Sequence, residues 1–282
     1  DMFFMGNGLA INDPNSGYDE TGFSAVENHC YDPDYKDKKT DQNISNMYAN
    51  REPRFYASVV YQGRSWFKKW MNGNPNYIVD FSAGGGNDLS NGDNVKTGYM
   101  LGKFKNRTVN HASGDTQSWK RVSIIYRLAE FYLFYAEALN ETDPSNPDII
   151  KYIDMVRERA GIPGYQTMND NGIKTGIIGN YDKQFDAIQH ERYVELYCEG
   201  QRYFDIRRWM ICGDKDRIGC DQTRFYGMNM KGSKDKTPGE PTSYYTRTKV
   251  ENRQWTDKLY LYPIHQNVIE LANGRIPQNY GW

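Results

Sequence analysis

Two stretches of the chain repeat apolar and polar residues at the spacing of amphipathic helices. Between residues 127 and 141, four polar residues fall in one narrow stripe when successive residues are placed about 100° apart. The stripe consists of Arg127, Glu130, Glu137 and Glu141. The other residues up to Leu139 are apolar or aromatic, so the pattern predicts a helix that is buried nearly all round. Ala129 and Ala136 lie together opposite the stripe, where a second helix could approach closely.

The following residues predict two further helical segments. Pro147 suits a first helical turn, the isoleucine- and valine-rich stripe after it reaches Val156, and Gly161 supplies a stop. Downstream, apolar residues at three- and four-residue steps mark one face of a helix over residues 185–196, and Gly200 interrupts the pattern. We expect these helices to form antiparallel pairs with one buried cluster. Its predicted members are Leu128, Tyr132, Leu139, Ile153, Val156, Leu196 and Trp209.

Outside these helices the pattern is weaker. Residues 55–63 are β-branched and aromatic and end at glycine, which predicts a strand. Residues 77–81 and 97–104 are candidate partner strands. The sequence therefore predicts a mainly α-helical fold with irregular loops and a few short β-strands, in three regions. These are a loop and short-strand region (1–120), a helical core (121–212, with a loop at 162–181) and a polar surface excursion with a closing tail (213–282).

Three glutamates in the helical core invite a catalytic interpretation. Glu191, Glu195 and Glu199 recur every four residues and share a helix face. Most glycoside hydrolases use two carboxyl groups, one on each side of the glycosidic bond, as their catalytic groups. Each glutamate also has arginines within three or four positions, however, and the run is a core helix. We therefore expect ion pairs that specify geometry. At least two of Glu130, Glu191, Glu195 and Glu199 should pair with an arginine among Arg127, Arg157, Arg192, Arg202 and Arg208.

Seven segments in register resemble the SusD/RagB family of surface-anchored glycan-binding lipoproteins. They are Arg51–Phe55, Arg127–Glu130, Tyr135–Ala138, Arg157–Gly161, Glu191–Trp209, Leu261–Ile264 and Pro277–Asn279. The resemblance covers about residues 50–282 and implies the C-terminal portion of a longer protein with tetratricopeptide-like helix hairpins.

The same resemblance implies a function. It implies non-catalytic binding of an oligosaccharide at the outer membrane and delivery to a SusC-like TonB-dependent transporter, without a cofactor. The lipid anchor would precede Asp1. Peptide uptake of the RagB kind is the alternative, and a glycosidase that uses the glutamates is a third.

Aromatic side chains are the candidate ligand contacts. A sugar has apolar C–H faces and a rim of hydroxyls, so an aromatic ring beside polar groups is a minimal recognition unit. One candidate group lies in a polar, turn-rich segment, and a second lies in the long excursion. The candidates are Trp66, Trp70, Asn74 and Tyr77 in the first group, and Tyr244, Tyr245 and Trp255 in the second.

Composition and cysteines exclude several other classes. The net charge of −1 gives no sign of nucleic-acid binding, and no apolar run approaches the length of a membrane-spanning helix. The four histidines are dispersed and no metal-binding motif is complete. Cys198 falls inside the helical pattern, where we expect it to be buried, and a Cys212–Cys220 bridge stays open.

Overall fold

The structure is a computed structural model, and it describes residues 1–25, 43–64, 78–90, 92, 94–105, 123–214 and 225–282. The chain divides into two compact units. Unit 1 comprises Asp1–Glu199 with Gly227–Thr248, and unit 2 comprises Gly200–Tyr226 with Lys249–Trp282. The described residues form seven α-helices and only short strands, which confirms the predicted mainly α-helical class.

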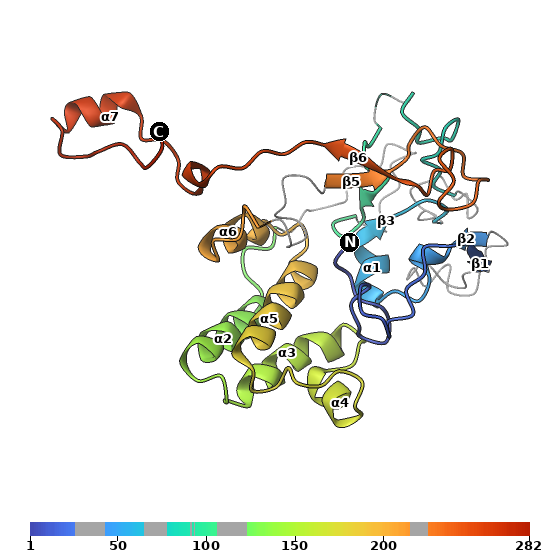
Figure 1. Cartoon of the computed structure of the whole chain (residues 1–282), viewed down its shortest axis with the longest axis horizontal. Coiled ribbons are helices and arrows are strands. Elements are labelled where there is room, and N and C mark those ends of the chain that lie inside the picture. The colour runs from blue at the N-terminus through green and yellow to red at the C-terminus, as the bar shows by residue number, and fades with distance from the viewer. Residues whose placement is uncertain (26–42, 65–77, 91, 93, 106–122, 215–224) are drawn as a thin grey trace. The chain divides into compact units, whose positions relative to one another are not determined.

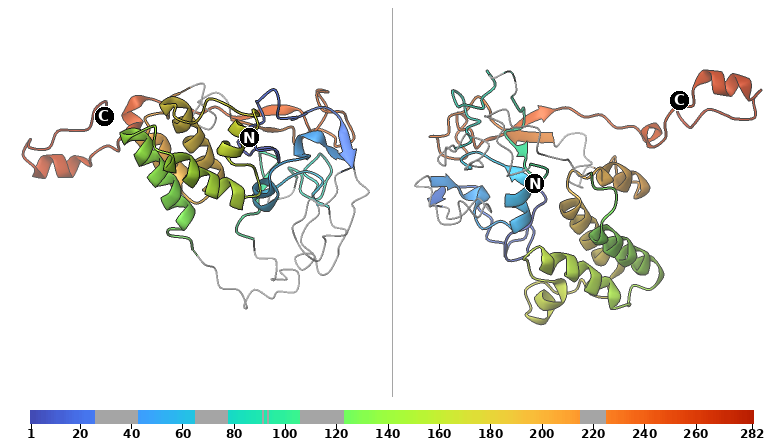
Figure 2. Two further views of the ribbon diagram at one scale, coloured as in Figure 1. Left: turned by 90° about the horizontal axis from the view of Figure 1, so that it is seen from below. Right: turned by 180° about the vertical axis from the view of Figure 1, so that it is seen from behind.

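Three helices of unit 1 lie side by side (Figure 1). They are α2 (Leu128–Thr142), α3 (Asp148–Arg159) and α5 (Tyr181–Glu195). Figure 2 shows the same arrangement from two other directions. Helix α3 follows Pro147 and ends before Gly161, whose φ of 85° is the left-handed conformation that favours glycine. Helix α5 begins at Asn180, whose side chain accepts a hydrogen bond from the Lys183 backbone N–H.

The buried faces of these helices form one apolar cluster, which we call the helical cluster. Its members are Leu9, Ala129, Leu133, Ala136, Ile149, Ile150, Ile153, Val156, Tyr165, Met168, Ile177, Ala187 and Ile188. Ile153 and Val156 belong to it as predicted, and Tyr132 and Leu139 pack against it partly buried. Leu196 is buried but is not a member. Trp209 is only partly buried and lies in unit 2, so its predicted place in this cluster is wrong.

Helix α2 is not buried all round. Its small residues Ala129 and Ala136 are buried, as expected for a face that other helices approach closely. Glu130 and Glu137, two members of the polar stripe, are buried as well. Leu128 is 62% exposed, so its predicted burial is wrong. The physical reason is that α3 and α5 cover one face of α2, and that face carries the alanines and part of the polar stripe.

The segment after Arg51 is helical at first, where the sequence predicted a strand throughout. Helix α1 spans Pro53–Ser58, and strand β3 is limited to Val59–Val60. Pro53 occupies the first helical turn, where its missing N–H costs nothing. Strand β3 pairs antiparallel with β4 (Met100–Leu101), which lies in the predicted partner stretch 97–104. A second antiparallel pair joins β1 (Phe23–Ala25) to β2 (Asn43–Ser45), and a 3₁₀ helix, η2 (Asn46–Tyr48), follows β2.

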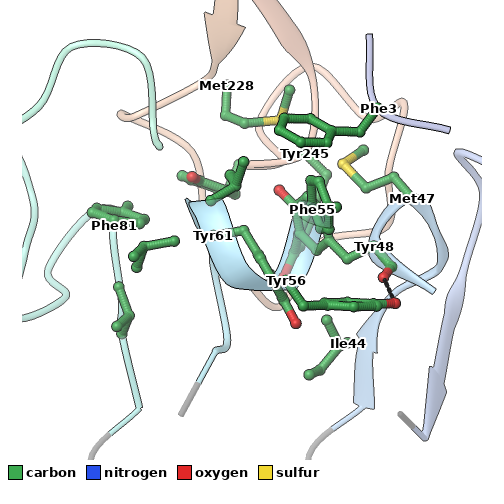
Figure 3. Packing of buried hydrophobic residues seen from close by; sticks show 14 of the residues in the cluster. Phe3, Ile44, Met47, Tyr48, Phe55, Tyr56, Tyr61, Phe81, Met228 and Tyr245 are labelled. Atoms are coloured by element: carbon green, nitrogen blue, oxygen red, sulfur yellow. Dashed lines mark hydrogen bonds between the residues drawn. The ribbon is translucent and has the colours of Figure 1, made fainter. Parts of the chain in front are cut away.

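A second buried cluster, rich in rings, surrounds α1 and β3 (Figure 3). Phe55 and Tyr61 stack with ring centroids 5.4 Å apart, and the hydroxyl of Tyr56 donates a 2.7 Å hydrogen bond to the carbonyl of Tyr48. We call it the aromatic cluster. Its buried members are Phe3, Phe4, Ile44, Met47, Tyr48, Phe55, Tyr56, Val59, Val60, Tyr61, Val79, Phe81, Ile162, Val194, Met228, Met230, Tyr244 and Tyr245. Burying tyrosines requires partners for their hydroxyls, and this cluster provides one for Tyr56 on the main chain.

The N-terminal residues join these two clusters within unit 1. Phe4 belongs to the aromatic cluster, and its backbone N–H donates to the buried carboxylate of Glu52 at 2.7 Å. The Phe4 ring also stacks on the imidazole of His190 in α5, with centroids 4.1 Å apart. Nε2 of His190 lies 2.6 Å from the Met2 carbonyl oxygen, to which it donates when it carries its proton.

Burial lowers the pKa of His190 from 6.5 to about 4, and we expect this to make stability depend on pH. Between those values the unfolded chain binds a proton that the folded chain does not. The free energy of unfolding should therefore fall as pH falls from 6.5 towards 4, by at most about 3 kcal/mol. Urea unfolding across this range would measure the slope.

His190→Gln should flatten that slope, whereas replacing the exposed His265 by Gln should leave it as in the wild type. The same slope in wild type and His190→Gln would contradict the assignment.

Two loops predicted from the sequence contain regular structure. Helix α4 (Tyr165–Asp170) lies within the predicted loop 162–181. The predicted excursion contains strands β5 (Phe225–Met228) and β6 (Arg247–Glu251), which form a two-stranded sheet. Unit 2 also holds three short helical elements. They are α6 (Gln201–Arg208), the 3₁₀ helix η5 (Asp257–Tyr260) and α7 (Gln266–Leu271).

Three further features concern cysteines and membrane spans. Cys198 is exposed, so its predicted burial is wrong. It follows the end of α5 and has a φ of 59°, outside the helical conformation that the prediction assumed. Cys220 lies outside the described residues, so the Cys212–Cys220 bridge stays untested. No helix in the described ranges has the length and apolar character needed to cross a bilayer.

Candidate functional site

The three glutamates form a buried ionic network rather than an open acid pair. Their side chains are 0%, 3% and 5% exposed for Glu191, Glu195 and Glu199. Glu191 binds Nη1 of Arg54 at 2.5 Å and Nη1 of Arg157 at 3.3 Å. Buried carboxylates held in this way are typical of ion pairs that fix geometry.

The other two glutamates share one arginine. Arg127 contacts Glu195 through Nη1 and Glu199 through Nε, the latter at 2.7 Å. Arg54 binds Glu195 at 2.9 Å, and Lys103 binds Glu199 at 2.5 Å. Three glutamates are thus paired with arginines, which confirms the predicted ion pairs. We call this set the glutamate network.

The partners in this network come from distant parts of the chain. Arg54 lies in the first turn of α1, and Arg127 directly precedes α2. The sequence offered Arg127, Arg157, Arg192, Arg202 and Arg208 as partners, so Arg127 and Arg157 pair as predicted and Arg54 was missed. Of these, Arg208 pairs with Asp205 at 3.0 Å, and the guanidinium carbon of Arg192 lies 4.2 Å from the centre of the Phe134 ring. The network therefore joins the α1 segment to the helices within unit 1.

Charge stabilisation argues against a catalytic acid at Glu195. Burial alone would raise the pKa of this carboxyl, but the neighbouring guanidinium groups, Arg127 first, outweigh burial and hold the pKa at about 2. A glycosidase needs one carboxylic acid whose pKa is raised toward neutral pH. Glu195 has the opposite shift, and none of the three glutamates has an exposed carboxylate.

The structure describes only some of the predicted ligand-binding residues. Trp66, Trp70, Asn74 and Tyr77 lie outside the described residues. Tyr244 and Tyr245 are buried members of the aromatic cluster, and the Tyr244 hydroxyl donates a 2.8 Å hydrogen bond to the Gly98 carbonyl. A ring buried in this way has no face left for a sugar, so Tyr244 and Tyr245 are not among the ligand contacts that we propose.

Trp255 is partly exposed and lies within unit 2. Its ring meets Tyr260 edge to face, with centroids 4.8 Å apart. A Cβ added at Gly213 would lie 2.9 Å from Trp255 Cδ1, so a larger residue there would displace this ring. Trp255 therefore has a defined position beside Tyr260.

Tyr260 also lines a cavity of about 470 Å³ in unit 2, which we call the C-terminal cavity. The residues that line it are Met210, Asp257, Lys258, Tyr260, Leu261 and Tyr280. Its volume falls within the range of about 300–1,000 Å³ that is usual for small-molecule sites. Tyr280 is 82% exposed, so its ring is open to solvent. The cavity thus combines two aromatic rings with an acidic and a basic side chain.

Sequence reasoning missed this cavity. Tyr260 and Tyr280 are twenty positions apart and share no periodic pattern. Within the described ranges, no group of three histidine, cysteine, aspartate or glutamate residues is placed to hold a metal ion.

Comparison with known proteins decides the family. The sequence model described as the SusD family matches residues 1–282. The chain belongs to the SusD family. A SusD-like protein P2 from Formosa agariphila is 37% identical over 82 residues, which cover 29% of this chain and 16% of that protein.

Two solved structures show the same fold as this SusD family chain. A SusD-like protein from Bacteroides fragilis matches all of the chain and 45% of its own length, with a TM-score of 0.68 and 27% identity. A SusD-like carbohydrate-binding protein from the same species matches 96% of the chain and 45% of its own length, with a TM-score of 0.60 and 22% identity. The chain therefore spans less than half the length of these relatives.

Proposed function

We propose that this chain is part of a non-catalytic protein that binds an oligosaccharide at the cell surface. Its membership of the SusD family along residues 1–282 is the observation that carries the proposal. A relative of the same fold is described as carbohydrate-binding. The buried glutamate network supports a binding role over hydrolysis, because its carboxylates are already occupied by guanidinium and ammonium groups.

The proposal includes a place and a partner. The resemblance noted from the sequence implies a lipid-anchored protein of the outer membrane that acts with a SusC-like TonB-dependent transporter. In that scheme the protein captures the oligosaccharide and the transporter carries it inward. Because binding and release must both be possible, shallow contacts by aromatic rings suit the task better than a closed catalytic pocket.

We place ligand contacts at two groups of aromatic residues. The first group is the predicted set Trp66, Trp70, Asn74 and Tyr77. The second is Tyr260 and Tyr280, which line the C-terminal cavity, together with Trp255, whose ring contacts Tyr260. There, ring faces could stack on the apolar face of a sugar while Asp257 and Lys258 accept from and donate to its hydroxyls.

Removing the exposed ring of the cavity should weaken sugar binding. We expect Tyr280→Ala to raise the dissociation constant about tenfold to a hundredfold, which corresponds to about 1–3 kcal/mol for the loss of one stacked ring, by analogy with stacking on nucleic-acid bases. Isothermal titration calorimetry with an oligosaccharide selected on a glycan array would measure the effect. The free energy of unfolding should stay nearly unchanged, because Tyr280 is so exposed.

The matched control is Tyr126→Ala, which removes a tyrosine that is 68% exposed in unit 1. It should leave the affinity as it is in the wild type. Equal affinities for wild type and Tyr280→Ala would remove the C-terminal cavity from the site. Trp66→Ala and Trp70→Ala would then test the first group.

A further inference from the structure

A second cavity lies in unit 1, and none of the aromatic residues assigned to sugar binding lines it. It has a volume of about 720 Å³ and lies between the N-terminal segment, α4 with the loop after it, and the first half of α5. We call it the α4–α5 cleft. Its size falls within the range of about 300–1,000 Å³ that is usual for small-molecule sites.

The inner wall of this cleft is apolar. It is formed by buried side chains of Leu9, Met168, Ile177 and Ala187. At the rim, Ile173 also lines the cleft and is 46% exposed. An aliphatic group that filled the cleft would cover Ile173 and contact the inner wall.

The rings in the cleft are poorly placed for stacking on a sugar. Phe4 is 2% exposed and Tyr165 is 6% exposed. Phe4 already stacks on His190, and the guanidinium of Arg157 lies over both rings, 4.7 Å from the centre of Phe4 and 4.1 Å from the centre of Tyr165. The cleft therefore favours an aliphatic ligand over a carbohydrate.

Four charged side chains line the cleft, namely Asp13, Lys174, Lys183 and Asp186, and Lys183 is the one that could bind an anionic group of the ligand. Lys174 is neutralised by Asp13, with Nζ 2.6 Å from the carboxylate. Lys183 is exposed, and no carboxylate in the described ranges forms an ion pair with it. A Cβ added at Gly176 would lie 3.3 Å from Nζ of Lys183, which places this ammonium beside the loop that forms one wall. The Lys183 ammonium is thus available to a ligand at the mouth of an apolar cavity.

We propose that the α4–α5 cleft binds a small aliphatic carboxylate. Its hydrocarbon part lies against Met168, Ile177 and Ala187, and its carboxylate pairs with Lys183. The asparagines at the rim, Asn12 and Asn15, can donate to the same carboxylate or to an adjacent amide. This site uses neither the residues nor the ligand class of the proposed oligosaccharide site, so each can fail without the other.

Two probes test the site and distinguish the sources of such a ligand. Hexanoate represents a free fatty acid, and N-acetyl-leucine represents the carboxyl end of a peptide. Titration of the full chain, residues 1–282, followed by saturation-transfer NMR is expected to detect binding of one or both acids. Binding of hexanoate alone assigns the site to free acids, and binding of N-acetyl-leucine alone assigns it to peptide ends. The absence of binding by both acids would overturn the proposal.

The charge requirement has its own controls. N-acetyl-leucinamide lacks the carboxylate and should bind more weakly than N-acetyl-leucine. If hexanoate is the only acid that binds, the comparison is with hexanamide, which should bind more weakly than hexanoate. Lys183→Gln should weaken binding of the acid up to about fivefold, the upper range for a solvent-exposed ion pair, and leave the amide unaffected. Lys231→Gln, which removes another exposed lysine outside the cleft, should match the wild type.

The variant results decide between a specific site and general attraction. Lys183 is exposed on the first turn of α5, so Lys183→Gln is expected to fold, and circular dichroism would verify this. Unchanged affinity of Lys183→Gln for the acid, or equal losses in Lys183→Gln and Lys231→Gln, would overturn the proposal. Ile173→Gln should weaken binding of acid and amide alike, because it removes an apolar contact that both ligands make.

Discussion

Replacing Leu133 by Ala is expected to lower the free energy of unfolding by about 2–5 kcal/mol. Leu133 lies in the middle of α2 with no exposed surface, among the residues of the helical cluster. Truncating it removes apolar contacts and leaves a cavity that the surrounding helices fill only in part. Urea unfolding followed by circular dichroism would measure the change.

Leu128→Ala on the same helix is the matched control. Leu128 is 62% exposed, so truncation there should change stability by no more than about 0.5 kcal/mol, as is usual for surface substitutions. The two variants change the same residue type in the same element and differ in burial. Equal losses for Leu128→Ala and Leu133→Ala would contradict the assignment of the buried face of α2.

Replacing Arg157 by Ala should lower the free energy of unfolding by about 3–5 kcal/mol, at least as much as Leu133→Ala. The side chain of Arg157 is fully buried, and it donates to the carbonyl oxygens of Gly8 at 2.8 Å and Pro163 at 3.0 Å. It also pairs with the fully buried carboxylate of Glu191. Alanine would leave these acceptors without their donor and the carboxylate with less compensation.

The geometry of Arg157 predicts more than a requirement for positive charge. Arg157→Lys should restore little of the lost stability, because one ammonium cannot reproduce the fork that reaches three acceptors. Lys151→Ala on the same helix removes an exposed pair with Asp148 and should cost no more than about 1 kcal/mol. A loss below about 1 kcal/mol for Arg157→Ala would contradict the structural role of this arginine.

Periodicity predicted the helices well because their capping and stop signals are local. Pro147 and Gly161 marked the limits of α3, and Gly200 marked the break before α6. Periodicity failed to predict which face of α2 is buried. It identifies a polar stripe but cannot show that α3 and α5 cover Glu130 and Glu137 and leave Leu128 exposed.

The candidate sites depend on contacts that no local pattern encodes. The glutamates were found from their four-residue spacing, but Arg54 reaches Glu191 across 137 positions. The C-terminal cavity and the α4–α5 cleft likewise combine residues from separate segments. Aromatic content directed attention to Tyr244 and Tyr245, yet ring type alone does not distinguish a core tyrosine from one that is open to a ligand such as Tyr280.

A single experiment tests the central claim, which is carbohydrate binding without catalysis. The chain would be applied to a glycan array, and each retained oligosaccharide would then be incubated with the protein and assayed for new reducing ends. We predict retention of at least one oligosaccharide and no release of reducing ends. Release that is lost in a folded Glu195→Gln variant, or failure to retain any glycan, would contradict the account.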